Sequence, residues 1–453
     1  MRNRFSSPVC LAAAALVVLS IGAGAAKPPQ TSQSAASIDT AQAAKVFKEV
    51  QAISDRDGGK MWGAPLYGAT LFVDENTRAL VANRPDYQNL LRPSGDVFVG
   101  SLPAEQNVAN TSMRWGGVSW TMVKWPLPES AFERDKLVIH ESFHRIQEQL
   151  GLGGPDTSND HLDSKEGRLW LQLEWRALRA AMLGQKEARM KAEEDALLFR
   201  AYRRFLFAEA AAHERDLEMA EGLPEYTGVA LCARTRADAF SYTATLLAEA
   251  PKFNTFVRSF AYVTGPAYGL LLDEAKPEWR KGLKAQDDLS ALLSTALGWA
   301  PPQDLKGVAL ARSQAYGGKD LAVSEEARAA KKEKEAVDLQ KRFVEGPVLN
   351  LPLTEAFSYS FDPTGQVPLE GAGTVYPYLR ISAAWGILEA TQGGLMLKKA
   401  DMISGIRVTA PKDAAARPLK GDGWTLTLKD GWAVVPGERK GDFELKRTAL
   451  KAP

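Results

Sequence analysis

The pattern of hydrophobic and polar positions changes twice along the chain and defines three regions. In residues 27–128, short runs rich in β-branched and aromatic residues lie between turn signals, which indicates a strand-rich region. In residues 129–342, apolar side chains recur at i, i+3 and i+4, which predicts helices. Residues 343–453 form short alternating segments between Gly, Pro and Lys-Asp-Gly turns, which predicts an accessory all-β domain, a sandwich or small barrel. The expected fold class is α+β.

Several strands are expected in the first region. The run "GATLFVDENTRALVANRP" predicts two strands around a turn at Asp74–Asn76, and "DVFVGSLP" predicts a third. The run "SMRWGGVSWTMVKWPLP" predicts further strand structure that stops at Pro126 and Pro128. A short helix is expected before these strands, from Ile38 to Ile53, because its apolar residues follow the helical period.

Two segments of the helical region depart from the simple amphipathic pattern. "FVRSFAYVTGPAYGLLLD" interrupts the helical period at Gly265-Pro266, so we expect a loop between two helices there. "SEEARAAKKEKEAVDLQKR" alternates in the sign of its charges and has a wide polar face, which is typical of a solvated connecting helix.

The composition is that of a folded globular protein and narrows the choice of partners. Hydrophobic residues make up 45% of the 453 positions and charged residues 25%, and this length suffices for two or three domains. The 56 basic residues balance 55 acidic ones, for a formal net charge of +1. This balance gives no electrostatic reason to expect nucleic acid or an anionic membrane as a partner.

The first 26 residues are typical of a secretory signal peptide. Two arginines precede an apolar stretch from Val9 to Ile21, and Ala23-Gly24-Ala25 fits a small-residue cleavage site. No later run reaches the roughly 18 apolar residues of a membrane span, so we expect none in the mature chain. Cleavage leaves Cys232 as the single cysteine, which excludes an internal disulfide. We therefore expect an exported bacterial protein, periplasmic or secreted.

The segment "DKLVIHESFHRIQEQL" carries the chemistry that the sequence shows most clearly. His140 and His144 are four residues apart, so on a helix both imidazoles face the same ion. Glu141 lies about 100° around that helix, where it can take a proton from a metal-bound water. Zinc suits such ligands, and a chance occurrence of the pattern is expected on the order of 0.01 times per chain.

Two histidines do not complete a catalytic zinc site, which normally has three protein ligands. His161 and His213 do not extend the motif, so a carboxylate on a later helix is the better expectation. Glu174 lies 30 residues beyond His144 and Glu221 lies 77 beyond it. Spacing by itself favours Glu174, because a compact helix-loop-helix site needs only a few tens of residues.

The combination of "HESFH" with the later "EGLPEY" resembles the Glu-zincin peptidases, distantly including the aminopeptidase N-like and glycyl-aminopeptidase-like groups. In those enzymes a helix bearing E-G-[LF]-x-x-Y follows the H-E-x-x-H helix and supplies the third zinc ligand. That glutamate corresponds to Glu221, and Gly222, Leu223 and Tyr226 match the rest of the motif. The resemblance covers roughly residues 135–230 and implies a zincin-like helical catalytic domain.

The resemblance implies that His140, His144 and Glu221 bind Zn²⁺ and that Glu141 is the general base. Glu174 stays open as the alternative third ligand, because the insertion between the two motifs is longer than usual in the family. Further candidates for partners of the ligands or for stabilisers of the transition state are Glu218, Tyr226, Tyr262 and Tyr268.

The expected function is that of an exported zinc metallopeptidase with a peptide or protein substrate. The run "GGVSWTMVKW" precedes the motif helix and is the candidate edge strand that pairs with an extended substrate. It lacks the glutamate that binds a substrate's amino terminus in aminopeptidases, so aminopeptidase activity is not expected. A zinc hydrolase of another amide, or a zincin-fold binding protein without activity, are the alternatives.

Overall fold

The computed structural model describes residues 38–103, 106–155, 157–354, 356–361, 366–369, 371–399 and 402–448. The signal peptide expected at residues 1–26 lies outside this range. The described chain is a mixed α+β protein with three sheets, which confirms the expected class. It divides into two compact units. Of the described residues, the first unit holds those up to His161, Trp170–Lys252 and Phe256–Tyr316, and the second holds Leu162–Leu169, Phe253–Thr255 and those from Gly317.

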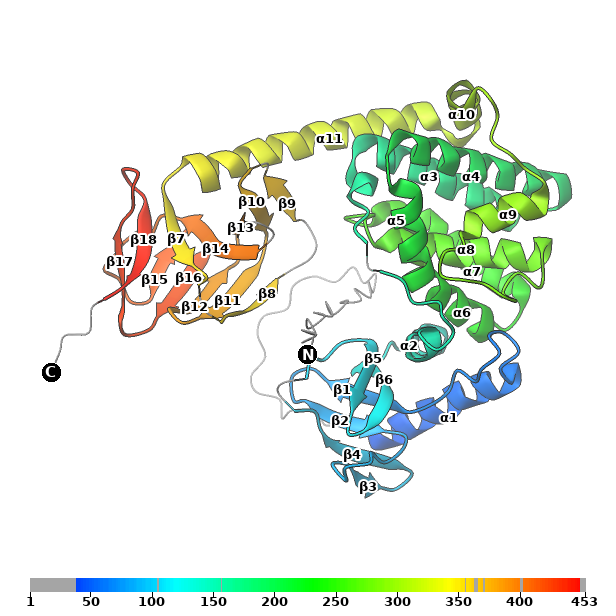
Figure 1. Ribbon diagram of the computed structural model, residues 1–453, viewed down its shortest axis with the longest axis horizontal. Coiled ribbons are helices and arrows are strands. Elements are labelled where there is room, and N and C mark those ends of the chain that lie inside the picture. Colours follow the sequence, from blue (N-terminus) through cyan, green and yellow to red (C-terminus); the bar gives the residue numbers. More distant parts are fainter. Residues whose placement is uncertain are drawn as a thin grey trace, which may run out of the picture. The chain divides into compact units, whose positions relative to one another are not determined.

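A six-stranded sheet in the first unit has the strand order β3-β4-β2-β1-β6-β5 (Figure 1). Its strands are β1 (Thr70–Asp74), β2 (Ala79–Ala82), β3 (Arg92–Ser94), β4 (Val97–Ser101), β5 (Thr111–Trp115) and β6 (Val118–Trp125). β1 and β2 are antiparallel, which confirms the predicted hairpin, whereas β1 and β6 run parallel. The parallel pair places β6, the strand before the motif helix, inside the sheet and next to the terminal strand β5.

The expected edge strand needs a correction. β6 is an interior strand, because it pairs with β1 on one side and with β5 on the other. β5 is the terminal strand of the sheet on this side. Gly116 and Gly117, with φ of 58° and 78°, form the tight turn of the β5–β6 hairpin. The two glycines therefore reverse the chain instead of admitting a substrate backbone.

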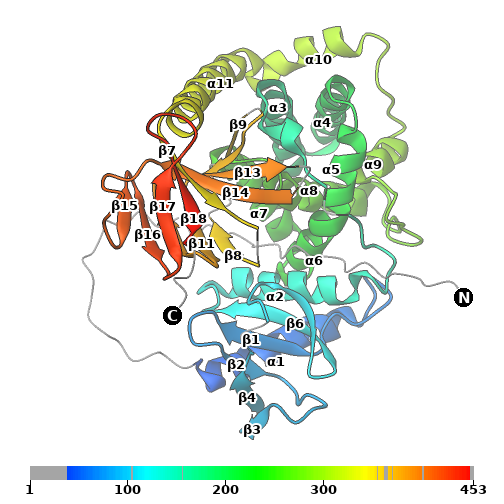
Figure 2. The same ribbon diagram turned by 60° about the vertical axis from the view of Figure 1, so that its left-hand side comes forward.

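Helices make up most of the remainder of the first unit. α2 packs on β5 and β6, and Figure 2 shows it next to β6. The described helices of the chain up to Tyr316, of which η1 and α3 each have residues in the second unit, are α1 (Thr40–Asp57), α2 (Ala131–Gln147), η1 (Asp160–Asp163), α3 (Lys165–Leu183), α4 (Lys186–Leu206), α5 (Ala210–Leu217), η2 (Glu218–Gly222), α6 (Leu223–Cys232), α7 (Arg236–Glu249), η3 (Ala250–Lys252), α8 (Ser259–Ala275), α9 (Leu289–Leu297), α10 (Leu305–Ser313) and η4 (Gln314–Tyr316). Within this set η2 is a single π-helical turn between α5 and α6. Such turns are rare in proteins, and those that occur are often found at functional sites.

The loop expected at Gly265-Pro266 is absent, because α8 continues through Pro266. The proline removes one helical hydrogen bond, but both residues are buried and their helix packs tightly against η2. A Cβ added at Gly265 would lie 2.3 Å from the Cα of Gly222. The glycine therefore serves close packing of two helical segments and does not mark a break.

The second unit contains a long helix followed by an all-β domain, as the sequence predicts. The helical part is α11 (Gly318–Gln340) and η5 (Lys341–Glu345). One sheet has the order β17-β18-β7-β14-β13-β10-β9 and the other the order β15-β16-β12-β11-β8. Buried residues of both sheets, among them Leu351, Ile381 and Trp424, form one core cluster, which defines a sandwich.

The strands of this sandwich are short. They are β7 (Val348–Pro352), β8 (Ser358–Phe361), β9 (Val367–Leu369), β10 (Gly373–Tyr376), β11 (Leu379–Ala383), β12 (Gly386–Ala390), β13 (Gly394–Lys399), β14 (Met402–Thr409), β15 (Leu419–Gly421), β16 (Trp424–Leu428), β17 (Trp432–Pro436) and β18 (Phe443–Arg447). Nearly all neighbours are antiparallel, with β18 and β7 as a parallel pair.

Candidate metal centre

Helix α2 presents two imidazole rings from one face. His140 and His144 lie one turn apart, and their Nε2 atoms are 3.1 Å from each other. His140 is 1% exposed and His144 is half-buried. The neighbouring apolar side chains Val138, Ile139 and Phe143 are fully buried and fix the rotation of the helix about its axis.

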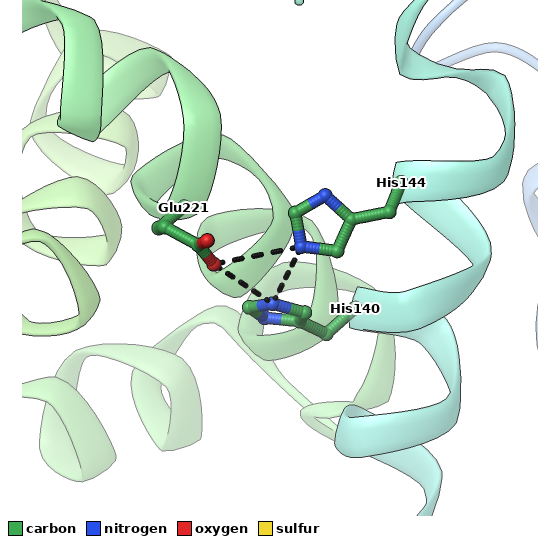
Figure 3. Close-up of side chains that lie close together, drawn as sticks. All are labelled: His140, His144 and Glu221. Carbon is green, nitrogen blue, oxygen red and sulfur yellow. Dashed lines mark hydrogen bonds and ion pairs between the residues drawn. The ribbon is translucent and has the colours of Figure 1, made fainter. Parts of the chain in front are cut away.

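Glu221 completes a cluster of three candidate metal ligands. It lies in the π-helical turn η2. Its Oε2 atom is 3.7 Å from Nε2 of His140 and 3.5 Å from Nε2 of His144 (Figure 3). One candidate ligand atom from each of the three residues lies within 4.8 Å of the others. The structure thus brings together the two histidines of the motif and the glutamate that the family resemblance indicates.

The separations of these atoms suit a tetrahedral ion. Zinc bonds of about 2.0–2.2 Å in tetrahedral geometry place ligand atoms about 3.3–3.5 Å apart. The measured separations are 3.1, 3.5 and 3.7 Å. Two imidazoles and one carboxylate are also a donor set that zinc favours, with a fourth position left for water. The residues present therefore fit a catalytic type of zinc site.

Glu141 is the neighbouring carboxylate, and it is 1% exposed. Its Oε2 atom has no hydrogen-bond partner among the described residues. Buried carboxylate oxygens in proteins are nearly always hydrogen-bonded, so a water or a substrate group is the expected partner here. Burial raises the pKa of Glu141, and the charges of His140 and His144 oppose this rise. A raised pKa suits a carboxylate that accepts and then returns a proton.

Glu225, one helical turn beyond Glu221, orients His140. Its Oε2 accepts a hydrogen bond from Nδ1 of His140 at 2.9 Å, and its Oε1 accepts one from Lys136. Burial would raise the pKa of Glu225, but Lys136 and His140 outweigh it and bring the pKa down to about 2. With Nδ1 as the donor, the neutral ring of His140 directs its Nε2 lone pair into the cluster. α6 can approach α2 this closely because residue 228 is a glycine. A Cβ atom at Gly228 would lie 2.8 Å from the Lys136 carbonyl oxygen.

The sequence interpretation did not identify Glu225 as a functional residue. The signal was present, because Glu221 and Glu225 are four residues apart and share one helix face. What the sequence could not show is that this face meets His140.

Helix α8 holds both oxygens of Glu221. Arg258 donates from Nη2 to Oε1 at 3.1 Å, and the Tyr262 hydroxyl donates to Oε2 at 2.6 Å. The Tyr262 ring also lies parallel to that of His140, with centroids 5.7 Å apart. Burial would raise the pKa of Glu221, but its close polar contacts with His140 and His144 outweigh it and hold this pKa well below the ordinary range. Glu221 is therefore an anion, as a cation ligand must be.

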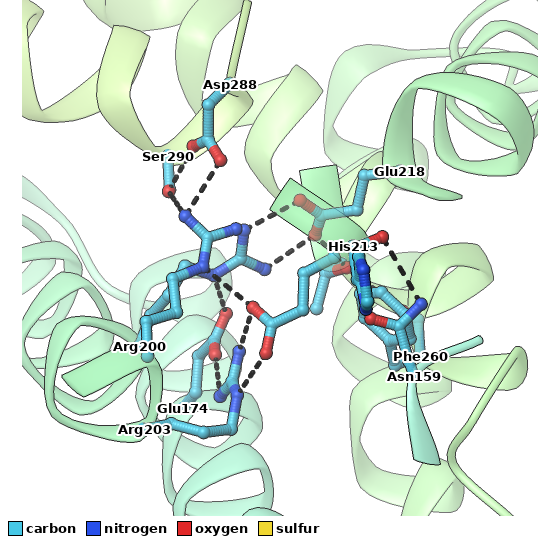
Figure 4. A network of polar contacts seen from close by, with 12 residues as sticks. Asn159, Glu174, Arg200, Arg203, His213, Glu218, Phe260, Asp288 and Ser290 are labelled. Carbon is cyan, nitrogen blue, oxygen red and sulfur yellow. Dashed lines mark hydrogen bonds and ion pairs between the residues drawn. The ribbon is translucent and has the colours of Figure 1, made fainter. Parts of the chain in front are cut away.

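Glu174, the alternative third ligand, lies in a separate buried network (Figure 4). Its Oε1 accepts hydrogen bonds from Arg200 at 2.7 Å and from the Tyr268 hydroxyl at 2.9 Å, and its Oε2 accepts one from Arg203. Glu218 belongs to the same network and receives two bonds from Arg200, of 2.6 and 2.7 Å. Spacing favoured Glu174 as the third ligand, and the structure corrects this expectation. Both oxygens of the Glu174 carboxylate accept hydrogen bonds from the guanidinium groups of Arg200 and Arg203 on α4.

Of the remaining candidate residues, some contact the cluster of His140, His144 and Glu221 and others pair with residues outside it. Tyr226 donates its hydroxyl hydrogen to Asp273 at 2.8 Å, and His161 pairs with Glu214 at 3.0 Å. Among the contacts of the described residues, Tyr262 is the candidate tyrosine that touches the cluster. Arg258 also touches it and was not singled out in the sequence, where nothing but its place one turn before Tyr262 indicates it.

Replacing Glu221 should separate the two rival ligands. Glu221→Ala removes a ligand, so its zinc affinity should fall by more than the roughly 10- to 100-fold expected for loss of an outer partner. Glu174→Gln keeps an oxygen for the Arg200 guanidinium and should bind zinc as the natural chain does. Competition with a chromogenic chelator measures both affinities. The reverse order of the two effects would assign the third ligand to Glu174.

Comparison of the chain with protein-family models, with curated proteins and with solved structures found no match in any of the three. Among the described helices, none combines the length and the apolar character that crossing a membrane requires. The functional conclusion therefore rests on the cluster of His140, His144 and Glu221, which could hold a metal ion.

Proposed function

We propose that this protein is a zinc-dependent peptidase of the Glu-zincin type. His140, His144 and Glu221 bind the metal and Glu141 is the general base. The observation that carries the proposal is the buried Glu141 oxygen that lacks a partner among the described residues, on a carboxylate that interacts electrostatically with all three residues of the cluster. A metal site that only stabilises a fold has no use for such a carboxylate, whereas hydrolysis requires a group that moves a proton.

In the proposed hydrolysis, the polar residues that contact the cluster move a proton or hold the ligands in place. Bound zinc supplies a Lewis acid and lowers the pKa of a coordinated water to ~7. Glu141 accepts the proton that the attacking water loses and delivers it to the amide nitrogen as the C–N bond breaks. Glu225 keeps the Nε2 lone pair of His140 directed at the cluster. Arg258 and Tyr262 fix the two oxygens of Glu221.

The sheet supports a peptide as the substrate. β5 is the terminal strand of the sheet on the side of β6, and it packs against α2, the helix that carries the motif. An extended peptide can add to such an edge through backbone hydrogen bonds. An exported location belongs to the same proposal and rests on the sequence of residues 1–26.

Metal analysis combined with a mixed peptide library tests this function. The purified protein should contain about one zinc per chain and should cleave the library, and a chelator should remove both properties until zinc is added back. His140→Ala should lack zinc. His213→Ala is the matched control, because the hydrogen bonds of His213 to other described residues use its backbone carbonyl and N–H groups and not its ring. A natural chain without zinc refutes the proposal, and a zinc protein that cleaves other amides but no peptide refutes the substrate class.

A further inference from the structure

Gln147 is the last residue of α2, three residues beyond His144, and it is 6% exposed. Its side-chain amide makes four contacts. Oε1 is 2.9 Å from Nδ1 of His144. Nε2 lies near three backbone carbonyl oxygens, those of Met219 at 2.8 Å, Ala220 at 3.2 Å and Leu152 at 3.2 Å.

These contacts determine the orientation of the amide. An NH₂ group can donate to carbonyl oxygens, whereas an amide oxygen in its place would face three acceptors. The NH₂ group of Gln147 therefore points toward the carbonyls, and Oε1 points toward His144. Because Oε1 can only accept, Nδ1 of His144 carries a proton, and in the neutral ring Nε2 keeps its lone pair. This lone pair is on the atom that lies 3.5 Å from Glu221.

The same amide joins two segments that are far apart in the sequence. Met219 and Ala220 belong to the π-helical turn η2 and directly precede Glu221. Gln147 therefore connects the end of α2 with the turn that supplies the third ligand. One buried side chain thus fixes the ring of one ligand and the backbone beside another.

We propose that Gln147 is a positioning residue that sets the tautomer of His144 and holds the turn of Glu221 at the distance from α2 that a metal ion requires. This inference rests on the proposed metal centre. It differs from a purely structural role, in which Gln147 would satisfy the carbonyls of η2 and affect folding without affecting the bound metal.

Replacement of Gln147 by methionine tests the inference, because methionine is unbranched and of similar length but cannot make these hydrogen bonds. The zinc affinity of folded Gln147→Met should fall about 10- to 100-fold, as for other outer partners of ligand histidines. The visible absorption spectrum of the Co²⁺-loaded variant should also change, because the arrangement of the ligands changes. Gln149→Met is the matched control on an exposed neighbour and should alter neither property.

The outcomes separate the two proposals. If the natural chain binds no zinc, the metal centre itself is refuted. If the natural chain binds zinc and Gln147→Met binds it equally well with an unchanged Co²⁺ spectrum, only the role of Gln147 is refuted.

A measurement on the natural chain needs no variant and remains decisive if Gln147→Met does not fold. Nitrogen chemical shifts of His144 in the metal-free protein, in mildly alkaline buffer, should show the proton on Nδ1. A proton on Nε2 would overturn the inference.

Discussion

Glu141→Gln is expected to lose hydrolytic activity by about 10²- to 10⁴-fold while the protein keeps its zinc. Glutamine has nearly the same shape as glutamate, so the fully buried position stays filled. It cannot accept the proton of the attacking water, and the Glu141 side chain is not one of the three clustered ligands. The rate and the metal content therefore respond differently to this single change.

The measurement compares kcat/KM on a peptide selected from the library with zinc content per chain. Glu148→Gln is the matched control, because Glu148 directly follows α2 and is exposed. Its activity and zinc content should equal those of the natural chain. Undiminished turnover by Glu141→Gln would show that another group is the base, and loss of zinc would show that Glu141 supports the metal directly.

The second large effect concerns stability. Arg203→Met is expected to destabilise the first unit by about 3–5 kcal/mol, because it removes one partner from a buried ion network. Arg203 is 0% exposed and donates hydrogen bonds to both Glu174 and Glu214. Methionine would fill part of the volume but would leave both carboxylates short of a donor. Urea unfolding followed by tryptophan fluorescence measures the change.

Arg179→Met is the control for this variant, since Arg179 is exposed on α3 and should change stability by no more than about 0.5 kcal/mol. Zinc binding by the folded fraction of Arg203→Met should persist, because Arg203 does not contact the cluster ligands in the hydrogen bonds of the described residues. A loss below about 1 kcal/mol would show that the network contributes little net stability.

The same network predicts sensitivity to acid. Burial would raise the pKa of Glu214, but the charges of Arg203 and Arg204 outweigh it and hold this pKa well below its ordinary value of 4.5. A carboxylate with a lowered folded-state pKa stabilises the protein above its unfolded-state pKa. The stabilisation is then lost as the pH falls below that value toward the folded-state pKa. Unfolding free energy should therefore decline in acid, and the decline should be smaller in Glu214→Gln.

Local spacing was sufficient for a substantial part of this protein. The hairpin of β1 and β2, the connecting helix α11 and the C-terminal β domain follow from periodicity and turn residues, which act over a few positions. The placement of His140 and His144 on one helix face follows from the same kind of information, because four residues make about one helical turn.

In two places the structure differs from what the local sequence indicates, because contacts between distant segments decide the conformation. Gly265-Pro266 is a typical signal for a loop, yet α8 continues there because Gly265 packs directly against Gly222. The strand before α2 was the candidate edge strand. It is β6, and its pairing with β1 on one side and β5 on the other places it inside the sheet. Neither contact involves residues near each other in the chain, so neither could be read from a short window.

The sequence by itself indicated His140 and His144 as two candidate ligands on one helix face with Glu141 beside His140, because these positions depend on spacing within one helix. The tertiary structure decided which carboxylate meets them. Arg200 and Arg203 engage both oxygens of Glu174, whereas η2, which packs against α8, brings Glu221 to the two histidines. It also decided which distant groups join the cluster, since Glu225 reaches His140 because α6 packs against α2, and the Gln147 amide of α2 binds the carbonyl of Met219 in η2. Such contacts depend on the packing of distant segments, which only the folded chain defines.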